Sequence, residues 1–174
     1  GSTFKLVSTH AALQAGVVSS NPDEIYYDKG FYRLENCTAG KCEFQNAGRQ
    51  ALGNVNLQRA ITASSDTYYY RIADLLWRGR DAYGDSPIQD SANLFGFGTK
   101  SGIELPSESA GLIGTPEWLA DVYAKNPKLW DHGDWKVGDT LNTSIGQGLV
   151  AATPLQLANA YATFANGGTR FVPK

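Results

Sequence analysis

The 174-residue sequence lacks the features that mark several classes of protein. No apolar run approaches the ~20 residues that a membrane-spanning helix needs. The net charge of -2 gives no reason to expect nucleic acid or an anionic membrane as a partner. There is no internal repeat and no low-complexity tract. An apolar fraction of 42% is instead typical of one soluble globular domain with enough chain to bury a core.

Cysteine and histidine are scarce, with two residues of each. Cys37 and Cys42 enclose Thr-Ala-Gly-Lys, and no histidine or second cysteine pair lies nearby to complete a zinc site. We therefore predict no metal site. In an oxidising compartment the two cysteines would form a local disulfide, and in the cytosol they would stay free thiols. The cysteines alone leave that choice open.

Hydrophobic periodicity and capping residues predict a mainly helical chain with short β segments. Helices are expected at 2–15, 55–63, 67–79, 90–94, 115–126 and 153–165. In the last of these, Leu155, Leu157, Ala158, Ala160, Tyr161 and Phe164 are expected to face inward. Residues 21–54 are predicted to form an irregular excursion, with a hairpin turn at Asp28-Lys29-Gly30. Residues 140–148 are expected to be extended.

The first candidate site is the pair Ser2 and Lys5, which one helical turn separates. A serine hydroxyl needs an adjacent base to act as a nucleophile. A lysine can be that base only where its surroundings let it lose its proton. Two other interpretations are an N-cap serine beside a solvated lysine, and a cloning remnant at Gly1-Ser2. His10, two turns beyond Ser2, is interpreted as structural because no partner for a catalytic histidine is apparent.

Two further stretches carry hydroxyl and charged side chains. Ser64-Ser65-Asp66 lies in a tight connection between two predicted helices, where it could point into a cleft or simply cap the next helix. Lys100-Ser101-Gly102 spells the Lys-Ser/Thr-Gly triplet of serine acyl-transferases, which belongs on a strand. Its flanking residues are typical of a loop, so we interpret this triplet as unrelated to a site.

Together these stretches resemble the transpeptidase domain of a class B penicillin-binding protein. Gly1-Ser2-Thr3-Phe4-Lys5 is similar to the Pro-Gly-Ser-Thr-x-Lys of that family, and Ser64-Ser65-Asp66 to its Ser-x-Asn motif. The most specific stretch runs from Gly138-Asp139-Thr140-Leu141-Asn142 through Ser144-Ile145-Gly146-Gln147-Gly148 to Thr153-Pro154-Leu155-Gln156-Leu157-Ala158. Ala165-Asn166-Gly167-Gly168 closes it. The resemblance covers most of the chain.

The resemblance implies acyl transfer through Ser2, with D-Ala-D-Ala stem peptides of peptidoglycan as substrates and β-lactams as acylating inhibitors. Lys5 would accept the Ser2 proton, Ser64 would relay a proton to the leaving amine, and Asp66 would orient Lys5 or the substrate. The N–H of Ser2 would be one oxyanion donor. Thr67, Gly146 and Gln147 would bind substrate. No metal or cofactor is implied.

Partners and location follow from the resemblance alone. It implies a site outside the cytoplasmic membrane, a full-length protein anchored by an N-terminal membrane helix, and a membrane glycosyltransferase of the SEDS type as a further partner. No nucleic-acid partner is expected.

Two departures from the family pattern matter. Asp66 stands where most members have asparagine, which favours the elongation-type subgroup similar to penicillin-binding protein 2. A carboxylate near Lys5 would favour its ammonium form, unless Asp66 is engaged elsewhere. The family also carries a Lys-Thr/Ser-Gly strand after the Asn-Gly-Gly segment, and this sequence ends at Lys174 before reaching it.

The sequence is therefore expected to be residues 1–174 of a partial transpeptidase domain, within which 21–54 is an excursion. We expect the helical part of an α/β penicillin-binding-protein or serine β-lactamase-like fold, with the central sheet largely outside this chain. By itself it should be inactive, with the apolar Ser2 helix uncovered. The alternatives are a serine β-lactamase, for which no deacylating base is apparent, and a non-catalytic β-lactam sensor or scaffold of the same fold.

Overall fold

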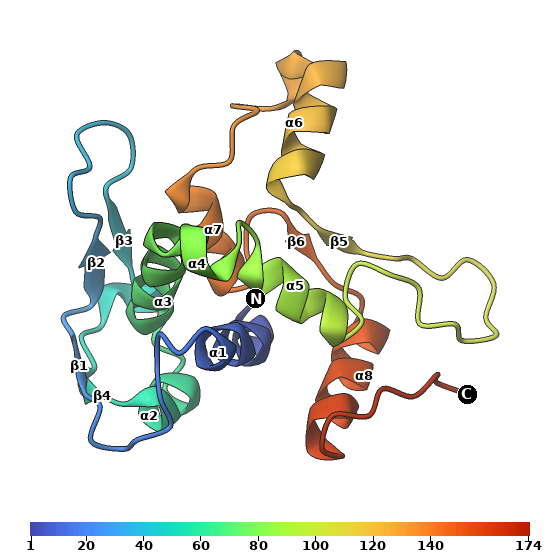
Figure 1. Cartoon of the computed structure of the whole chain (residues 1–174), viewed down its shortest axis with the longest axis horizontal. Coiled ribbons are helices and arrows are strands. Elements are labelled where there is room, and N and C mark those ends of the chain that lie inside the picture. Colours follow the sequence, from blue (N-terminus) through green and yellow to red (C-terminus); the bar gives the residue numbers. More distant parts are fainter.

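Helix α3 (Asp66–Arg78) carries a large part of the buried core. Eight of its thirteen residues are buried, including Tyr68, Tyr69 and Leu76. It packs against α7 (Val137–Ser144), α1 (Lys5–Gln14) and strands of the 21–54 segment. In the computed structural model, which describes all 174 residues, α3 lies between the strands of the 21–54 segment and helices α1 and α7 (Figure 1).

The chain is mainly helical with short paired strands, as predicted. In chain order the elements are η1 (Ser2–Phe4), α1 (Lys5–Gln14), β1 (Tyr26–Asp28), β2 (Phe31–Arg33), β3 (Glu43–Gln45), η2 (Ala47–Arg49), β4 (Gly53–Val55), α2 (Leu57–Thr62), α3 (Asp66–Arg78), α4 (Arg80–Tyr83), α5 (Pro87–Leu94), β5 (Leu112–Ile113), α6 (Pro116–Lys125), η3 (Pro127–Leu129), α7 (Val137–Ser144), β6 (Val150–Ala151) and α8 (Pro154–Ala165). No helix is long and apolar enough to cross a membrane.

The strands form three separate antiparallel pairs, β1 with β4, β2 with β3, and β5 with β6. The predicted hairpin turn at Asp28-Lys29-Gly30 is therefore wrong, because β1 and β2 do not pair with each other. The Asp28 side chain is fully buried and accepts hydrogen bonds from residues far along the chain, so this bend sends β2 into another sheet. The hairpin of this region is β2–β3, whose tip projects from the body of the fold (Figure 1).

Residues 140–148 are another correction, because most of this stretch is helical rather than extended. Helix α7 begins after Lys136, whose backbone N–H donates to the Asp139 carboxylate at 2.8 Å. Leu141 and Ile145 are buried. The β-branched residues of this stretch favour strands. Packing of one helix face against α3 outweighs that preference.

Capping residues explain where four of the eight α-helices begin. The side chains of Asn56, Ser65, Thr115 and Thr153 each accept a hydrogen bond from the backbone N–H three residues later. Three of these caps precede helices expected from the sequence at nearly these bounds. The fourth, Asn56, shows that the predicted 55–63 helix begins two residues later, after strand β4.

The expectation that the apolar Ser2 helix would be uncovered is wrong. Helix α1 is well covered, with Val7, Ala11 and Ala12 buried against neighbours within this chain. The expectation that Tyr161 and Phe164 of α8 face inward is also wrong, because their side chains are 44% and 60% exposed. The side of α8 that is buried presents Gln156, Ala160 and Thr163.

The loop after α5 explains this polar interior. Gln156 Nε2 donates to the carbonyl oxygens of Thr99 and Ala110, both at 2.8 Å, so an amide satisfies the loop backbone there. Lys100-Ser101-Gly102 lies in this loop and not on a strand, as predicted.

Candidate active site

Ser2 is positioned by a tight turn at the entrance to α1. The turn η1 is closed by the Phe4 N–H, which donates to the Gly1 carbonyl at 2.8 Å, and the Phe4 ring is buried against Phe97. Ser2 itself is exposed and lines a pocket of about 250 Å³. Lys5, one turn later, is 3% exposed and points inward. The Ser2 hydroxyl makes no hydrogen bond within the protein, so it is free to meet a ligand.

Ser64 and Asp66 reach the same pocket from the connection between α2 and α3. Ser64 has a φ of 56°, a left-handed conformation that costs energy for a non-glycine residue. Its backbone N–H donates to the Ile61 carbonyl at 3.2 Å, and the Ser65 hydroxyl caps α3 by accepting from the Tyr68 N–H at 3.1 Å. The turn between two helices therefore presents Ser64 on one side and buries Ser65 on the other.

The Lys5 ammonium links helix α1 to the connection between α2 and α3. Lys5 Nζ donates to the Ser64 hydroxyl at 2.9 Å, to the Ser64 carbonyl at 2.9 Å and to Asp66 Oδ1 at 2.6 Å. The aromatic face of Tyr69 lies 5.3 Å from the same nitrogen. All three hydrogen bonds of the ammonium are thus directed at the second motif. This contact provides a direct path for a proton between Lys5 and Ser64.

Behind this connection lies a buried polar cluster made of Asp28, Gly30, Asn46, Ser65 and Thr67, here called the Asp28 cluster. The Asp28 carboxylate accepts from the Ser65 hydroxyl at 2.6 Å, the Gly30 N–H at 2.7 Å and Asn46 Nδ2 at 2.9 Å. Asn46 Oδ1 in turn accepts from the Thr67 N–H at 2.9 Å. Burial by itself would raise the pKa of Asp28, but these donors outweigh it and hold the pKa below its usual value.

The Asp28 cluster shows what the 21–54 segment does for the site. The hydrogen bonds of this cluster connect the bend after β1 and the turn after β3 to the first residues of α3. A second link is the Ala47 N–H, which donates to Asp66 Oδ2 at 3.3 Å. Sequence reasoning missed Asp28, Asn46 and Ala47. The only signal was the position of Asp28 two residues before a glycine, and it suggested a local turn instead.

The three residues expected to bind substrate lie in different surroundings. Thr67 is fully buried in the Asp28 cluster, which favours a structural role. Gly146 has a φ of 70° and packs on the Ser2 turn, where an added Cβ would lie 2.4 Å from the Gly1 carbonyl oxygen. Gln147 is exposed, and its backbone N–H donates to the Asn142 carbonyl. Contact of these residues with substrate stays a prediction.

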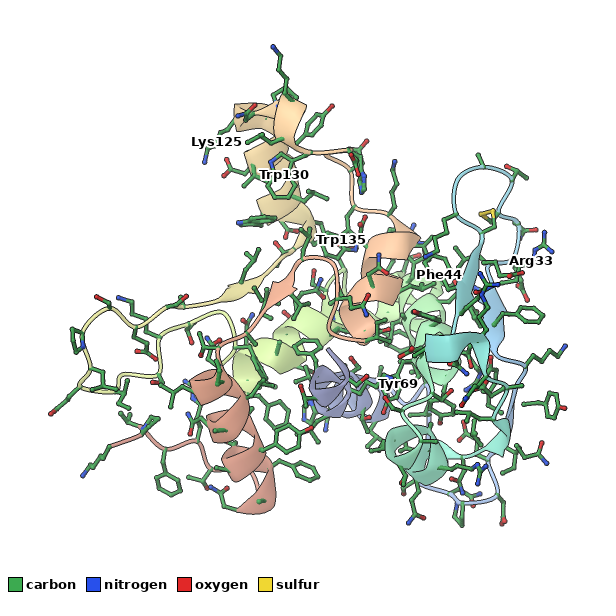
Figure 2. All side chains as sticks on the ribbon, turned by 180° about the vertical axis from the view of Figure 1, so that it is seen from behind. Arg33, Phe44, Tyr69, Lys125, Trp130 and Trp135 are labelled. Carbon is green, nitrogen blue, oxygen red and sulfur yellow. A yellow bond between two sulfur atoms is a disulfide. The ribbon has the colours of Figure 1, made fainter.

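The remaining residues singled out from the sequence lie away from the pocket. Cys37 and Cys42 form a disulfide at the tip of the β2–β3 hairpin, visible as the yellow bond in Figure 2. His10 Nδ1 lies 3.0 Å from the Ser91 hydroxyl, and its ring packs edge-on against Phe95. No group of three or more His, Cys, Asp or Glu side chains is placed to hold a metal ion.

Comparisons with known proteins show which family the chain belongs to. The family model described as the penicillin binding protein transpeptidase domain matches residues 1–174. The peptidoglycan D,D-transpeptidase MrdA of Acinetobacter baumannii is 36% identical over 99% of this chain, and MrdA of Escherichia coli K12 is 30% identical over 99%. The chain spans 23% and 24% of the length of these two relatives.

Solved structures show the same relationship. The chain matches PBP2 of Pseudomonas aeruginosa in complex with WCK 5153 with a TM-score of 0.81 and 34% identity, over 99% of this chain and 35% of that one. It matches PBP2 of Helicobacter pylori in complex with MreC with a TM-score of 0.78 and 28% identity, over 99% and 28% of the two chains. The helical, weakly stranded architecture is thus part of a PBP2 transpeptidase fold. The chain belongs to the penicillin-binding protein transpeptidase family, and its similarity is to the class B, elongation-type MrdA and PBP2 proteins.

Proposed function

We propose that the protein containing this chain is a serine D,D-transpeptidase, and that Ser2 forms its acyl-enzyme. The observation that carries the proposal is the contact of Lys5 Nζ with both the Ser64 hydroxyl and Asp66 Oδ1, beside a pocket that Ser2 lines. Two segments distant in sequence, residues 2–5 and 64–66, would have no other evident reason to gather one exposed hydroxyl, a buried ammonium and a second hydroxyl.

The reaction would proceed in two acyl transfers. Ser2 Oγ attacks the carbonyl of the penultimate residue of a D-Ala-D-Ala peptide, and Lys5, once neutral, accepts the Ser2 proton. The C–N bond breaks, and the leaving D-alanine amine takes a proton through Ser64, which Lys5 contacts directly. An amine of a second peptide then attacks the ester carbonyl and forms the cross-linking amide. The acyl C–Oγ bond breaks, and the proton lost by the amine returns to Ser2 Oγ through Lys5. Asp66 holds the Lys5 side chain in place throughout, and the Ser2 N–H stabilises the oxyanion.

Intact-mass spectrometry of the natural protein after benzylpenicillin treatment tests this proposal. We expect one stable adduct, on the peptide that contains Ser2, and its loss in Ser2→Ala. The exposed Ser19 provides a matched control, since Ser19→Ala should keep the adduct. The absence of an adduct would support the alternative of a non-catalytic scaffold. Rapid release of the adduct together with sustained nitrocefin turnover would indicate a β-lactamase, and either result overturns the proposal.

Location and assembly are part of the same proposal. Stem-peptide cross-linking takes place outside the cytoplasmic membrane, so we place the protein there. Among similar structures, one is a PBP2–MreC complex, and another is described as a peptidoglycan synthase complex that coordinates polymerization and crosslinking. A membrane glycosyltransferase of the SEDS type is the corresponding partner proposed here.

A further inference from the structure

A second depression adjoins the candidate active site along the same face of α3. Its volume is about 670 Å³, and only one of its seven lining residues is hydrophobic. These residues define the basic groove: Lys41, Glu43, Gln45, Asn46, Gly48, Arg49 and Tyr70. Asn46 lines both the basic groove and the Ser2 pocket. Asp66 and Tyr70 are four residues apart on α3 and so share one face, which makes the two depressions neighbours.

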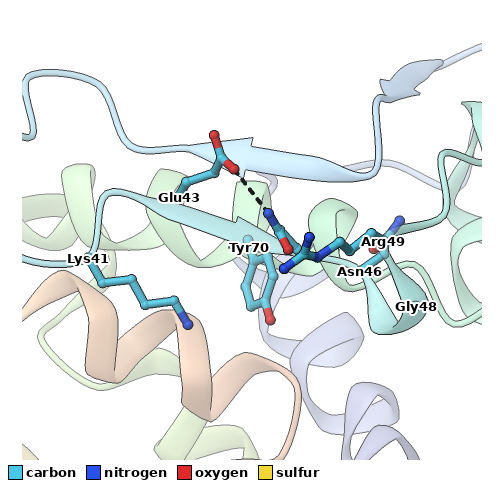
Figure 3. Close-up of a pocket in the computed structure, with 7 residues that line it drawn as sticks. Lys41, Glu43, Asn46, Gly48, Arg49 and Tyr70 are labelled. Carbon is cyan, nitrogen blue, oxygen red and sulfur yellow. Dashed lines mark hydrogen bonds between the residues drawn. The ribbon is translucent and has the colours of Figure 1, made fainter.

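Two cations of the basic groove have no carboxylate partner, although Lys41 Nζ lies 4.7 Å from the centre of the Phe44 ring. Lys41 and Arg49 are exposed, and neither takes part in an ion pair. Figure 3 shows their side chains reaching in from either side of Tyr70. The single carboxylate of the groove, Glu43, accepts a hydrogen bond from Gln45 at 3.1 Å, so it is already engaged. With two cations and one anion, the groove carries a formal charge of +1.

The Tyr70 hydroxyl is a third unused donor. Tyr70 is only 6% exposed, and its hydroxyl has no hydrogen-bond partner in the protein, although its ring lies in the core beside Phe44. Burial, followed by the nearby charge of Asp66, raises the pKa of Tyr70 to about 12, so the phenol keeps its proton at neutral pH. A phenol O–H without a protein partner, in a groove also lined by two cations that form no ion pair, is suited to an anionic acceptor.

We propose that the basic groove binds a carboxylate of a peptide that reacts at Ser2, either as acyl donor or as acceptor amine. The donors would be the Arg49 guanidinium, the Lys41 ammonium and the Tyr70 hydroxyl. This inference rests on the proposed function, since it assigns an anionic peptide to the neighbouring pocket. Exposed ion pairs are individually weak, but a planar guanidinium can grip a carboxylate through two parallel hydrogen bonds. The groove therefore contributes substrate selection, while acylation belongs to the Ser2 pocket.

The test compares matched peptides on the natural protein and its variants. The donor is a synthetic peptide ending in D-Ala-D-Ala with one upstream residue as either glutamate or glutamine, and the same pair of residues is placed in an acceptor amine peptide. The measured quantity is kcat/KM for the glutamate form divided by that for the glutamine form. We expect the wild type to prefer glutamate about fivefold in the donor or in the acceptor, as one exposed charge contact allows.

The variants then assign that preference to the groove. The double variant Lys41→Gln/Arg49→Gln should lose it, Lys41→Glu/Arg49→Glu should reverse it, and Tyr70→Phe should weaken it. The double variant Lys29→Gln/Arg59→Gln removes the same charge from exposed sites elsewhere and should keep it. Added salt should reduce the preference, because exposed charges are screened.

Benzylpenicillin acylation of the same samples separates the two proposals. If Ser2 is acylated at equal rates in the wild type and the groove variants, the catalytic site is intact. Under that condition, a wild type without preference in either peptide, or a preference that survives Lys41→Gln/Arg49→Gln, overturns the basic groove. Absence of acylation in the wild type would instead overturn the proposed function itself.

Discussion

The hydroxyl of Ser65 donates a 2.6 Å hydrogen bond to the buried carboxylate of Asp28, 37 residues earlier in the chain. Because Ser65 lies between Ser64 and Asp66, this bond holds the backbone of the second motif from behind. The left-handed φ of Ser64 needs such support, since the surrounding structure must offset its cost.

Asp28→Asn should therefore weaken both the fold and the site. The new amide would replace one carboxylate oxygen with an NH2 group, so either the Gly30 N–H or the Ser65 hydroxyl would lose its acceptor. We expect a loss of about 2 kcal/mol in the free energy of unfolding. Displacement of Ser64 should slow benzylpenicillin acylation about tenfold or more. Thermal midpoints and acylation rate constants measure the two effects. The exposed Asp85→Asn is the control, and equal behaviour of the two variants would contradict the role of Asp28.

The contribution of Asp28 should depend on pH with a definite sign. Its pKa is lower in the folded than in the unfolded chain, so the unfolded chain takes up the proton first as the pH falls. The stability that Asp28 provides is complete above its ordinary pKa of about 4 and is lost as the pH drops through the lowered value. The stability gap between wild type and Asp28→Asn should be level near neutrality and shrink in acid. Urea unfolding at several pH values measures it, and a gap that grows in acid would be inconsistent with this sign.

Gly146 should tolerate no side chain, because it packs on the Ser2 turn. In Gly146→Ala the new Cβ would lie 2.4 Å from the Gly1 carbonyl oxygen and 2.6 Å from Phe4 Cβ. Gly16 is a matched control, since its φ of 68° is nearly the same and nothing lies within 4 Å of an added Cβ. Gly16→Ala should cost about 1–2 kcal/mol from backbone strain alone, and Gly146→Ala about 1–3 kcal/mol more from overpacking. Only Gly146→Ala should slow acylation of Ser2, and an equal effect of both variants would argue against this contact.

The Cys37–Cys42 disulfide should stabilise the protein without serving the chemistry. It closes a short loop at the tip of the β2–β3 hairpin, away from Lys5 and Ser64. Constraint of so short a loop is worth about 2 kcal/mol in the chain-entropy account. The Cys37→Ser/Cys42→Ser variant should lower the thermal midpoint while its rate of benzylpenicillin acylation stays unchanged. A large fall in that rate would show that the hairpin tip shapes the Ser2 pocket.

Alkaline pH should destabilise the core around α3. Burial, ahead of every other cause, raises the pKa of Tyr69 to about 12, whereas the unfolded side chain titrates near its model value of 10.0. A raised pKa means that stability is complete below the unfolded value and is lost as the pH rises towards the folded one. Thermal midpoints should fall between about pH 10 and pH 12. Tyr69→Phe should be less stable at neutral pH, because its hydrogen bond with Thr9 is lost, yet show a smaller alkaline decline.

Sequence alone determined the local features of this protein. Capping residues and hydrophobic spacing placed α3, α6 and α8 to within about two residues, since caps and one-sided burial act over single helical turns. Motif spacing also singled out Ser2, Lys5, Ser64 and Asp66 as candidates, and the stretch from Gly138 to Gly168 gave the most specific resemblance to the family. These signals act over a few residues, so they can be recognised from the sequence alone.

Tertiary structure decided everything that depends on contacts between distant segments. Strand β1 pairs with the distant β4 and not with β2, Asp28 has a partner 37 residues away, and the helical state of α7 follows from packing against α3. The inward side of α8 is polar because loop carbonyls meet Gln156 there. The basic groove likewise needs Lys41 and Arg49 to be brought beside Tyr70. Buried carboxylates, unpaired cations and helix faces acquire their roles only from neighbours that spacing along the chain does not reveal.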